Sequence, residues 1–355
     1  MPAAGSRGGG DDDLVPSILD QYGVRAKQRL GQYLRGQGDG GGHLAYLYDH
    51  LRDYPSRGGR SLRPSLCIAS AKAFGGTLED ALDSAVALEI MHNAFLIHDD
   101  VEDLSEQRRG RPTLHQLHGV PLAVNAGDAM TVLGLRPLLD NGRTLGPRTA
   151  LRILEEAERM GREAVEGQAM ELGWRRENAV DLDEADYLRM VLKKTCSYTT
   201  IFPMRVGAIV AGRDDGEGLD RLSQFSFFLG SAFQIQDDLL NLVGDPEDYG
   251  KETAGDLWEG KRTLMLIHLL GQVDGAERDW LRAIMGAPRA AITVADVTRM
   301  RRLMDRHGSI EYGRAFAHAC AGAALHEFSL AFSGVRSSRD RDFIERLCTW
   351  VIERA

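Results

Sequence analysis

Two clusters of carboxylates lie near the ends of strongly apolar segments. In the first cluster, Asp99, Asp100 and Asp103 occupy positions i, i+1 and i+4. On a helix, Asp99 and Asp103 would project from one face about 6 Å apart. Like charges at this spacing repel by a few tenths of a kcal/mol. A solvated helix end would tolerate them, but the apolar turns before Asp99 predict a buried helix that aims these carboxylates inward.

The second cluster repeats this spacing with Asp237, Asp238 and Asn241. Two buried helices that both end in carboxylates repel each other strongly unless cations lie between them. The potential ligands are oxygen atoms, which favours a hard ion such as Mg²⁺ over zinc or copper. Mg²⁺ usually takes one or two carboxylates and completes its shell with water and substrate phosphates. If the two clusters face each other, we expect a phosphate-bearing substrate between them.

Basic residues near both clusters in the sequence could bind such a substrate. Arginine suits bidentate phosphate recognition, whereas lysine acts as a point charge. Any one basic residue is more often a solvated surface charge, so it is their distribution beside both clusters that indicates phosphate binding. The residues are Arg57, Arg60, Arg63, Arg108, Arg109, Lys193, Lys194, Lys251 and Lys261.

The elements that must position these side chains have the apolar spacing of helices. Residues 81–99, 150–172 and 219–243 each repeat apolar side chains at three- and four-residue spacing. Alternating β-branched segments between turns are missing, so we expect no sheet. The pattern predicts a single all-α domain of about ten helices over residues 14–355. We expect a disordered lead at 1–13 and a glycine-rich loop at 36–42.

Composition narrows the class of protein further. The 355 residues carry a net charge of -9, which argues against nucleic acid as a partner. No apolar run approaches the ~20 residues of a transmembrane helix, and the first residues lack the apolar stretch of a signal peptide. Four widely separated cysteines without a CxxC pair indicate reduced thiols. We therefore expect a soluble, cytoplasmic protein.

Together these motifs resemble those of the trans-isoprenyl diphosphate synthases, the polyprenyl synthetase family that includes farnesyl and geranylgeranyl diphosphate synthases. The resemblance runs from about residue 44 to residue 270. It rests on both acidic clusters and on GGRSLRP at 58–64, Arg108-Arg109-Gly110, Gly167-Gln168, Lys194-Thr195, Phe233-Gln234 and GDLWEGKRT at 255–263. Three positions depart from the family pattern: Asn241 replaces the usual Asp, Arg60 the usual Lys and Ser61 the usual Arg. We expect Arg57 to compensate for Ser61.

The resemblance implies a helical bundle of the isoprenoid-synthase type, with a central active-site cavity, that forms a homodimer. It implies a transferase that condenses isopentenyl diphosphate head to tail with an allylic diphosphate (dimethylallyl, geranyl or farnesyl). Mg²⁺ is the implied cofactor, with three ions bound together with the allylic diphosphate. The departing diphosphate is the expected base for the final proton loss.

The same resemblance assigns a role to each matching residue. The implied metal ligands are Asp99, Asp100, Asp103, Asp237 and Asp238. The residues that neutralise the departing diphosphate are Arg108, Lys194, Lys251 and Lys261. The residues that bind the diphosphate of isopentenyl diphosphate are Arg60, Arg63, His92 and Arg109. Thr195 and Gln234 are expected to stabilise the allylic cation through fixed dipoles.

The resemblance also links product length to the side chains one turn before Asp99. In the family, bulky aromatic side chains at the positions of both Ala94 and Phe95 accompany a fifteen-carbon product. Here one of these two aromatic side chains is absent, because position 94 is alanine, and the other is present as Phe95. We expect room for one further five-carbon unit, and therefore geranylgeranyl diphosphate (C20) as the main product. Farnesyl diphosphate or a longer product is the alternative, in which Ala94 is only a small packing residue.

Two other functions share the scaffold that the motifs imply. A class I terpene cyclase ionises a single diphosphate substrate, whereas this chain carries the GGRSLRP segment and lacks an NDxxSxxxE-like second motif. A non-catalytic partner subunit should have lost an acidic cluster, and both are substantially present here. We therefore favour prenyl transfer over both.

Overall fold

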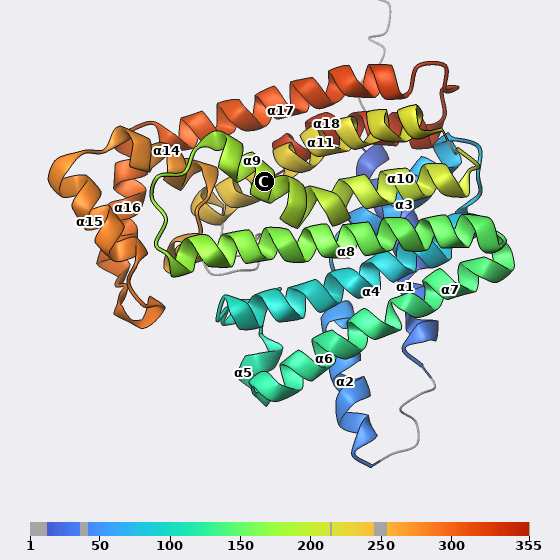
Figure 1. The fold of residues 1–355 in the computed structure, drawn as a ribbon, viewed down its shortest axis with the longest axis horizontal. Helices are drawn as coiled ribbons and strands as arrows, with labels where there is room; N and C mark the ends of the chain where they lie inside the picture. Colours follow the sequence, from blue (N-terminus) through green and yellow to red (C-terminus); the bar gives the residue numbers. More distant parts are fainter. Residues whose placement is uncertain (1–12, 36–41, 214, 245–253, 355) are drawn as a thin grey trace, which may run out of the picture.

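Long helices packed side by side build the protein (Figure 1). The structure is a computed structural model that describes residues 13–35, 42–213, 215–244 and 254–354. Residues 1–12, most of the expected loop at 36–42, and Lys251 lie outside the described residues. Within the described part of the chain, no helix is long and apolar enough to cross a membrane.

The elements of the first half of the chain lie on both sides of the first acidic cluster, which sits at the end of α4. They are α1 (Leu14–Tyr33), α2 (Leu44–Ser56), α3 (Leu62–Ala73), α4 (Leu78–Glu102), β1 (Gln107–Arg108), β2 (Arg111–Pro112), α5 (Leu114–His118), α6 (Val120–Leu133), α7 (Leu135–Thr144) and α8 (Pro147–Arg176).

The remaining elements contain the second cluster. They are α9 (Glu184–Val191), the π-helix η1 (Leu192–Ile201), α10 (Phe202–Val210), α11 (Gly216–Val243), α13 (Gly255–Trp258), α14 (Leu264–Gln272), α15 (Gly275–Met285), the 3₁₀-helix η2 (Arg289–Ala291), α16 (Val294–Arg306), α17 (Ser309–Ala331) and α18 (Arg339–Glu353).

The longest helices cross the molecule in roughly the same direction, and α15 and α16 form one end (Figure 1). Helix α11 packs along α17, α4 packs between α3 and α6, and α8 packs against η1. The three segments predicted from apolar spacing are helical as α4, α8 and α11, so the all-α prediction is confirmed. The described residues contain more than the expected ten helices, because glycine and proline divide several of the runs, as at Gly134 between α6 and α7.

Helix α4 shows why the sequence folds in this way locally. It begins with a capping box, in which the Thr77 side chain accepts a bond from the Asp80 amide and the Asp80 side chain accepts one from the Thr77 amide. Apolar residues on all its sides bury most of its length, as expected for a helix inside a core. The helix ends at Glu102, so its buried body carries the first acidic cluster to the centre of the molecule.

Helix α8 and the π-helix η1 approach each other very closely at Gly167. A Cβ atom at Gly167 would lie 2.7 Å from Lys194 Cα and 2.8 Å from Lys193 C, and closer still to the Lys194 backbone nitrogen. Only glycine permits this backbone contact. Wide turns such as η1 are frequent at functional sites, and this one carries Lys194 and Thr195.

The structure contains a short two-stranded sheet, where the sequence predicted none. Residues Gln107–Arg108 and Arg111–Pro112 pair as a short antiparallel hairpin. Its two-residue turn consists of Arg109 and Gly110, which both have positive φ (54° and 70°), as a type I′ turn requires. Strands of two residues have no alternating pattern to detect, which is why the sequence did not reveal them.

Candidate active site

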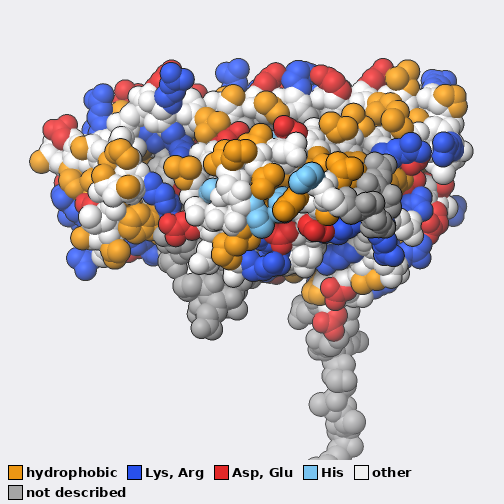
Figure 2. Space-filling model, turned by 90° about the horizontal axis from the view of Figure 1, so that it is seen from below, with side chains coloured by type: hydrophobic (Ala, Val, Ile, Leu, Met, Phe, Trp, Pro, Cys, Tyr) orange, Lys and Arg blue, Asp and Glu red, His pale blue; other side chains and the backbone are white. Residues whose placement is uncertain are grey.

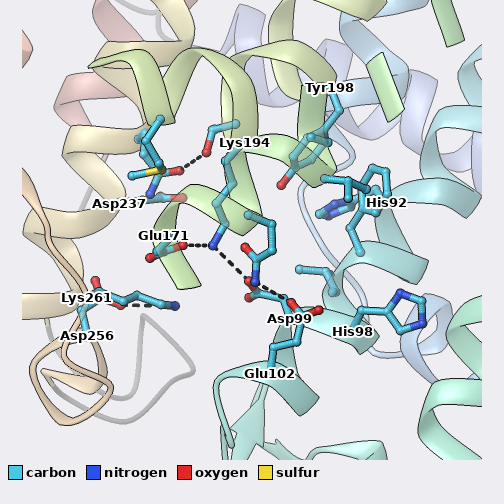
Figure 3. A pocket seen from close by; sticks show the side chains of 18 of the residues that line it. His92, His98, Asp99, Glu102, Glu171, Lys194, Tyr198, Asp237, Asp256 and Lys261 are labelled. Atoms are coloured by element: carbon cyan, nitrogen blue, oxygen red, sulfur yellow. Dashed lines mark hydrogen bonds and ion pairs between the residues drawn. The ribbon is translucent and has the colours of Figure 1, made fainter. Parts of the chain in front are cut away.

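A cavity of about 800 Å³ opens between α4, α6, α8, η1 and α11. The predicted site residues that line it are Arg63, His92, Phe95, Asp99, Arg108, Arg109, Lys194, Thr195, Gln234, Asp237, Asp238 and Lys261. Asp99 and Asp237 lie on different walls, and the Lys194 side chain extends between them (Figure 3). Asp99 of the first cluster and Asp237 and Asp238 of the second therefore face one cavity.

The carboxylates of the first cluster are paired with cations from other elements. Asp99 lies 3.2 Å from the Lys194 ammonium and 3.5 Å from the Arg108 guanidinium. Asp103 is buried behind the cavity wall, 2.7 Å from the Lys261 ammonium and in contact with the Arg175 guanidinium. Burial raises the pKa of Asp103 to about 6, although Lys261 opposes this shift.

Asp100 points away from the cavity. Its buried carboxylate accepts a bond from the Tyr54 hydroxyl, and its two oxygens share the Arg108 Nε hydrogen at N–O distances of 3.0 and 3.2 Å. Adjacent positions on a helix differ by about 100° in direction, so Asp99 and Asp100 cannot face the same space. The structure therefore places Asp100 as the anchor of Arg108, which does line the cavity.

The second cluster is held by a different set of partners. Asp237 Oδ1 lies 2.5 Å from a guanidinium nitrogen of Arg354, which also donates to the Phe233 carbonyl at 2.9 Å. Asp238 accepts bonds from Tyr187 (2.8 Å) and from Gln234 Nε2 (2.7 Å). Burial, with the nearby charge of Asp256 as a second cause, raises the pKa of Asp238 well above its ordinary value.

Asn241 faces the backbone instead of the main cavity. Its side-chain oxygen accepts a bond from the Asp256 amide at 3.1 Å, and its own carbonyl accepts one from the Ala254 amide at 2.8 Å. These bonds fix the start of α13. The neutral amide of Asn241 therefore holds the backbone of Asp256, whose side chain lines the cavity.

Lys194 has a carboxylate partner on each side. Besides Asp99, it contacts Glu171 of α8 in a short ion pair (Figure 3). Burial alone would lower the pKa of Lys194, but the charges of Asp99 and Glu171 raise it above its ordinary value. Next to it, Thr195 donates to Gln234 Oε1 at 2.8 Å, and Gln234 in turn donates to Asp238. Lys194 is thus a fixed cation beside fixed dipoles.

A second group of basic side chains lies further along the cavity. Arg63 lies 3.2 Å from His92 Nε2, donates to Thr199 at 2.9 Å and covers the Tyr198 ring at 4.7 Å. Burial lowers the pKa of His92 well below its ordinary value, and the charges of Arg63 and Arg109 lower it further, so the imidazole is neutral. Arg109 contacts the Gly58 carbonyl.

Two arginines expected to bind phosphate lie elsewhere. Arg60 is exposed, and its guanidinium lies over the Trp350 ring at 5.5 Å without lining the cavity. The buried Arg57 donates to Asp53 (2.5 Å) and to the carbonyls of Arg108 (3.0 Å) and Pro112 (2.8 Å). Arg57 holds the β1–β2 hairpin, so the expectation that it compensates for Ser61 was wrong.

The two residues expected to control product length differ in position. Phe95 lines the cavity and meets the Tyr198 ring edge-on, with centroids 5.4 Å apart. Ala94 is fully buried in the core and does not line the cavity. The cavity lining also includes Val132 and Val165, whose exposed fractions are 67% and 63%.

Several residues of the site were missed in the sequence. Glu171 is paired with Lys194, Arg175 with Asp103, Tyr187 with Asp238 and Arg354 with Asp237. Glu171 follows Gly167 by one helical turn, a spacing that could have revealed it. The other three come from distant segments with no distinctive pattern around them.

The donor set of the cavity fits Mg²⁺. Its two walls offer carboxylate oxygens, which this hard ion prefers. Among the described residues, no three acidic, histidine or cysteine side chains lie close enough together to hold an ion alone. That is the arrangement expected where phosphate oxygens and water complete the coordination.

Comparison with known proteins agrees with this geometry. A family model described as "Polyprenyl synthetase" matches residues 45–304. The chain belongs to the polyprenyl synthetase family. It is 32% identical over 297 residues to a short chain isoprenyl diphosphate synthase of Methanothermobacter thermautotrophicus, a match that covers 84% of this chain and 87% of that protein. It is 30% identical over 342 residues to a geranylgeranyl pyrophosphate synthase of Geoglobus acetivorans, covering 96% and 99% of the two chains.

Solved structures of this family share the fold. A geranylgeranyl pyrophosphate synthase from Corynebacterium glutamicum, complexed with isoprenyl diphosphate and magnesium, superimposes with a TM-score of 0.85 at 27% identity, covering 95% of this chain and 99% of that one. The resemblance inferred from the motifs is confirmed, and so is the isoprenyl-synthase fold. This polyprenyl synthetase is a prenyl-transferring enzyme.

Proposed function

We propose that this polyprenyl synthetase condenses isopentenyl diphosphate head to tail with allylic diphosphates and releases geranylgeranyl diphosphate. The observation that carries this proposal is one cavity in which Asp99 and Asp237 lie on different walls, with a second cationic group at Arg63 and Arg109. A terpene cyclase, which ionises one diphosphate, would not need that second group.

Magnesium ions, three by analogy with the family, would be held by Asp99 and Asp237 together with the allylic diphosphate. Asp103 would join them once Lys261 and Arg175 turn toward the phosphates. Bound there, the ions would act as Lewis acids and make diphosphate a better leaving group. Relatives crystallised with isoprenyl diphosphate and magnesium or calcium support this assignment.

The side chains of the protein would carry out the remaining work. Lys194, Arg108 and Lys261 hold fixed positive charge where the carbon–oxygen bond of the allylic substrate breaks and negative charge grows on the diphosphate. The Thr195 and Gln234 oxygens face the resulting allylic cation. The isopentenyl double bond then attacks that cation, and the departing diphosphate takes the proton lost from the new chain.

The isopentenyl diphosphate would bind at Arg63, Arg109 and His92. Two guanidinium groups can each offer a pair of donors to phosphate oxygens. The neutral His92 accepts from Arg63 and so turns its guanidinium without adding a charge of its own. This arrangement keeps the homoallylic diphosphate apart from the metal-binding walls.

Phe95 is the proposed limit on chain length. It lies on the cavity wall one helical turn from Asp99, where a growing chain must pass. Relatives named as geranylgeranyl diphosphate synthases and as geranylfarnesyl diphosphate synthases both match this chain. They support the C20 product and leave the longer product as the alternative.

We further propose a homodimer that acts in the cytoplasm. Apolar side chains on α6, α7 and α8 are exposed, among them Leu122, Leu135, Leu139 and Leu151. Figure 2 views the molecule from the side of α5 and α6 and shows apolar side chains among charged ones on that face. Large exposed apolar patches mark interaction sites. Buried, free cysteines suit a reducing compartment.

The purified protein tests the proposal directly. With isopentenyl diphosphate, Mg²⁺ and each allylic diphosphate in turn, chromatography should show mainly a C20 product, and chelation of the metal should abolish it. Asp99→Ala and Asp237→Ala should each lower kcat by several orders of magnitude while circular dichroism shows a folded protein. Asp305→Ala, on the surface of α16, is the matched control and should leave kcat unchanged. Near-normal turnover in both cavity variants would contradict the proposal.

A further inference from the structure

The phosphate-binding end of the cavity has fewer cations than the sequence suggested. Arg57 is committed to the β1–β2 hairpin, and Arg60 lies over Trp350. Position 61 carries serine. This leaves Arg63 and Arg109 beside a neutral His92 for a diphosphate that carries several negative charges.

Helix α1 explains why position 61 is small. Ser61 adopts a left-handed conformation (φ 52°) immediately before α3. A Cβ atom at Gly23 of α1 would lie only 2.9 Å from both Ser61 Cβ and Ser61 Oγ. The backbone of α1 therefore rests directly on residue 61, and a long side chain there would collide with it.

The same face of α1 brings a cation to this loop. Lys27 follows Gly23 by four positions, so both residues face the same side of the helix. The Lys27 ammonium lies 3.5 Å from the Gly59 carbonyl oxygen. On the other side of Gly59, a Cβ atom would lie 2.8 Å from a guanidinium nitrogen of Arg109. Lys27 and Arg109 thus approach the same glycine.

The charge of Lys27 is also available to bind an anion. Within the described residues it pairs with no carboxylate, whereas Arg25 on the same helix is ion-paired with Glu79. The positive charges of Arg63, Arg109 and Lys27 act together on half-buried Glu89 and lower its pKa against the larger, opposite effect of burial. Lys27 therefore belongs to the same electrostatic group as the two arginines.

We propose that Lys27 is a binding residue for the diphosphate of isopentenyl diphosphate, supplying from α1 the positive charge that Ser61 lacks. The inference rests on the proposed function and deepens it. A lysine ammonium on a flexible stem can leave the Gly59 carbonyl and reach a phosphate oxygen beside Arg109. Lys27 is not among the residues that line the cavity with Asp99 and Asp237, so its charge should act on one substrate alone.

Calorimetric binding of isopentenyl diphosphate to the metal-free protein, together with steady-state kinetics, tests this assignment. Lys27→Ala should weaken isopentenyl diphosphate binding and raise its KM roughly 10-fold, with kcat and the KM for the allylic diphosphate unchanged. Lys27→Arg should retain most of the affinity. Arg25→Ala, the matched control on the exposed face of α1, should change neither binding nor kinetics.

Arg63→Ala separates a failure of this inference from a failure of the proposed function. If Arg63→Ala weakens isopentenyl diphosphate binding and Lys27→Ala does not, Lys27 has no binding role and the proposed function stands. If neither variant changes binding, the location of the isopentenyl site is wrong as well. An equal loss of kcat and of both substrate affinities in Lys27→Ala would show a structural role and overturn the assignment.

Discussion

The variant Gly167→Ala tests whether the close contact between α8 and η1 is required for activity. Ordinary carbon contacts begin near 3.4 Å, whereas a Cβ at position 167 would lie 2.7 Å from Lys194 Cα. Gly167→Ala must therefore push the two helices apart by at least 0.7 Å, because both partners are backbone atoms and neither can rotate away. The displaced residue is Lys194 itself.

The expected magnitudes follow from two opposing effects. Replacing glycine by alanine inside a helix stabilises a protein by about 0.5–1 kcal/mol. Overpacking a close contact costs about 1–3 kcal/mol. We therefore expect Gly167→Ala to lower the free energy of unfolding by up to about 2.5 kcal/mol. A misplacement of about 1 Å at a reacting centre costs roughly 10²-fold, so kcat should fall by about that factor.

Gly161→Ala is the matched control, because a Cβ at Gly161 on the same helix meets no atom within 4 Å. Urea denaturation should show that this control gains about 0.5–1 kcal/mol of stability, with kcat unchanged. If Gly167→Ala gives the same stability gain and the same kcat as Gly161→Ala, the close approach is not required. The reasoning about Lys194 would then be refuted.

Two further predictions concern the cavity and its cations. Phe95→Ala should lengthen the main product beyond C20 in chromatography, and an unchanged product length would place the limit on chain length elsewhere. Ala94→Phe should instead lower the free energy of unfolding by about 1–3 kcal/mol, because Ala94 lies in the packed core. Arg354→Ala should lower the Tm of the metal-free protein, because Asp237 then lacks this cation. Addition of Mg²⁺ and pyrophosphate should raise the Tm of Arg354→Ala more than that of the wild-type protein, because the metal no longer has to displace Arg354. An equal rise in Tm in the two proteins would count against the pairing of Arg354 with Asp237.

The sequence predicted the features that repeat locally. The i, i+4 spacing of Asp99 and Asp103 and the apolar turns before them were enough to infer a buried acidic helix, and the structure contains it as α4. The same spacing did not predict that Asp100 contacts Tyr54, because the direction of a single side chain depends on tertiary packing. The motif alone therefore assigned Asp100 to the metal.

Contacts between distant segments could not be predicted from the sequence. Arg354 lies more than a hundred positions from Asp237, yet the two side chains are paired. Arg57 lies next to the GGRSLRP segment and was expected at the phosphate, but its guanidinium turns toward the hairpin carbonyls. Proximity in sequence therefore did not predict which cation faces which anion, because the tertiary packing decides those pairs.

The pairing of the acidic clusters with the protein's own cations has a consequence for the order of binding. In the structure, Lys194 is held by Asp99, Lys261 by Asp103 and Arg354 by Asp237. A metal ion that arrives alone must displace a cation, and a displaced Lys194 or Lys261 then keeps Glu171 or Glu259 as its partner. When the diphosphate arrives with the metal, the displaced ammonium and guanidinium groups gain phosphate oxygens as partners. Metal and allylic diphosphate should therefore bind with positive cooperativity, each raising the affinity for the other by the same factor.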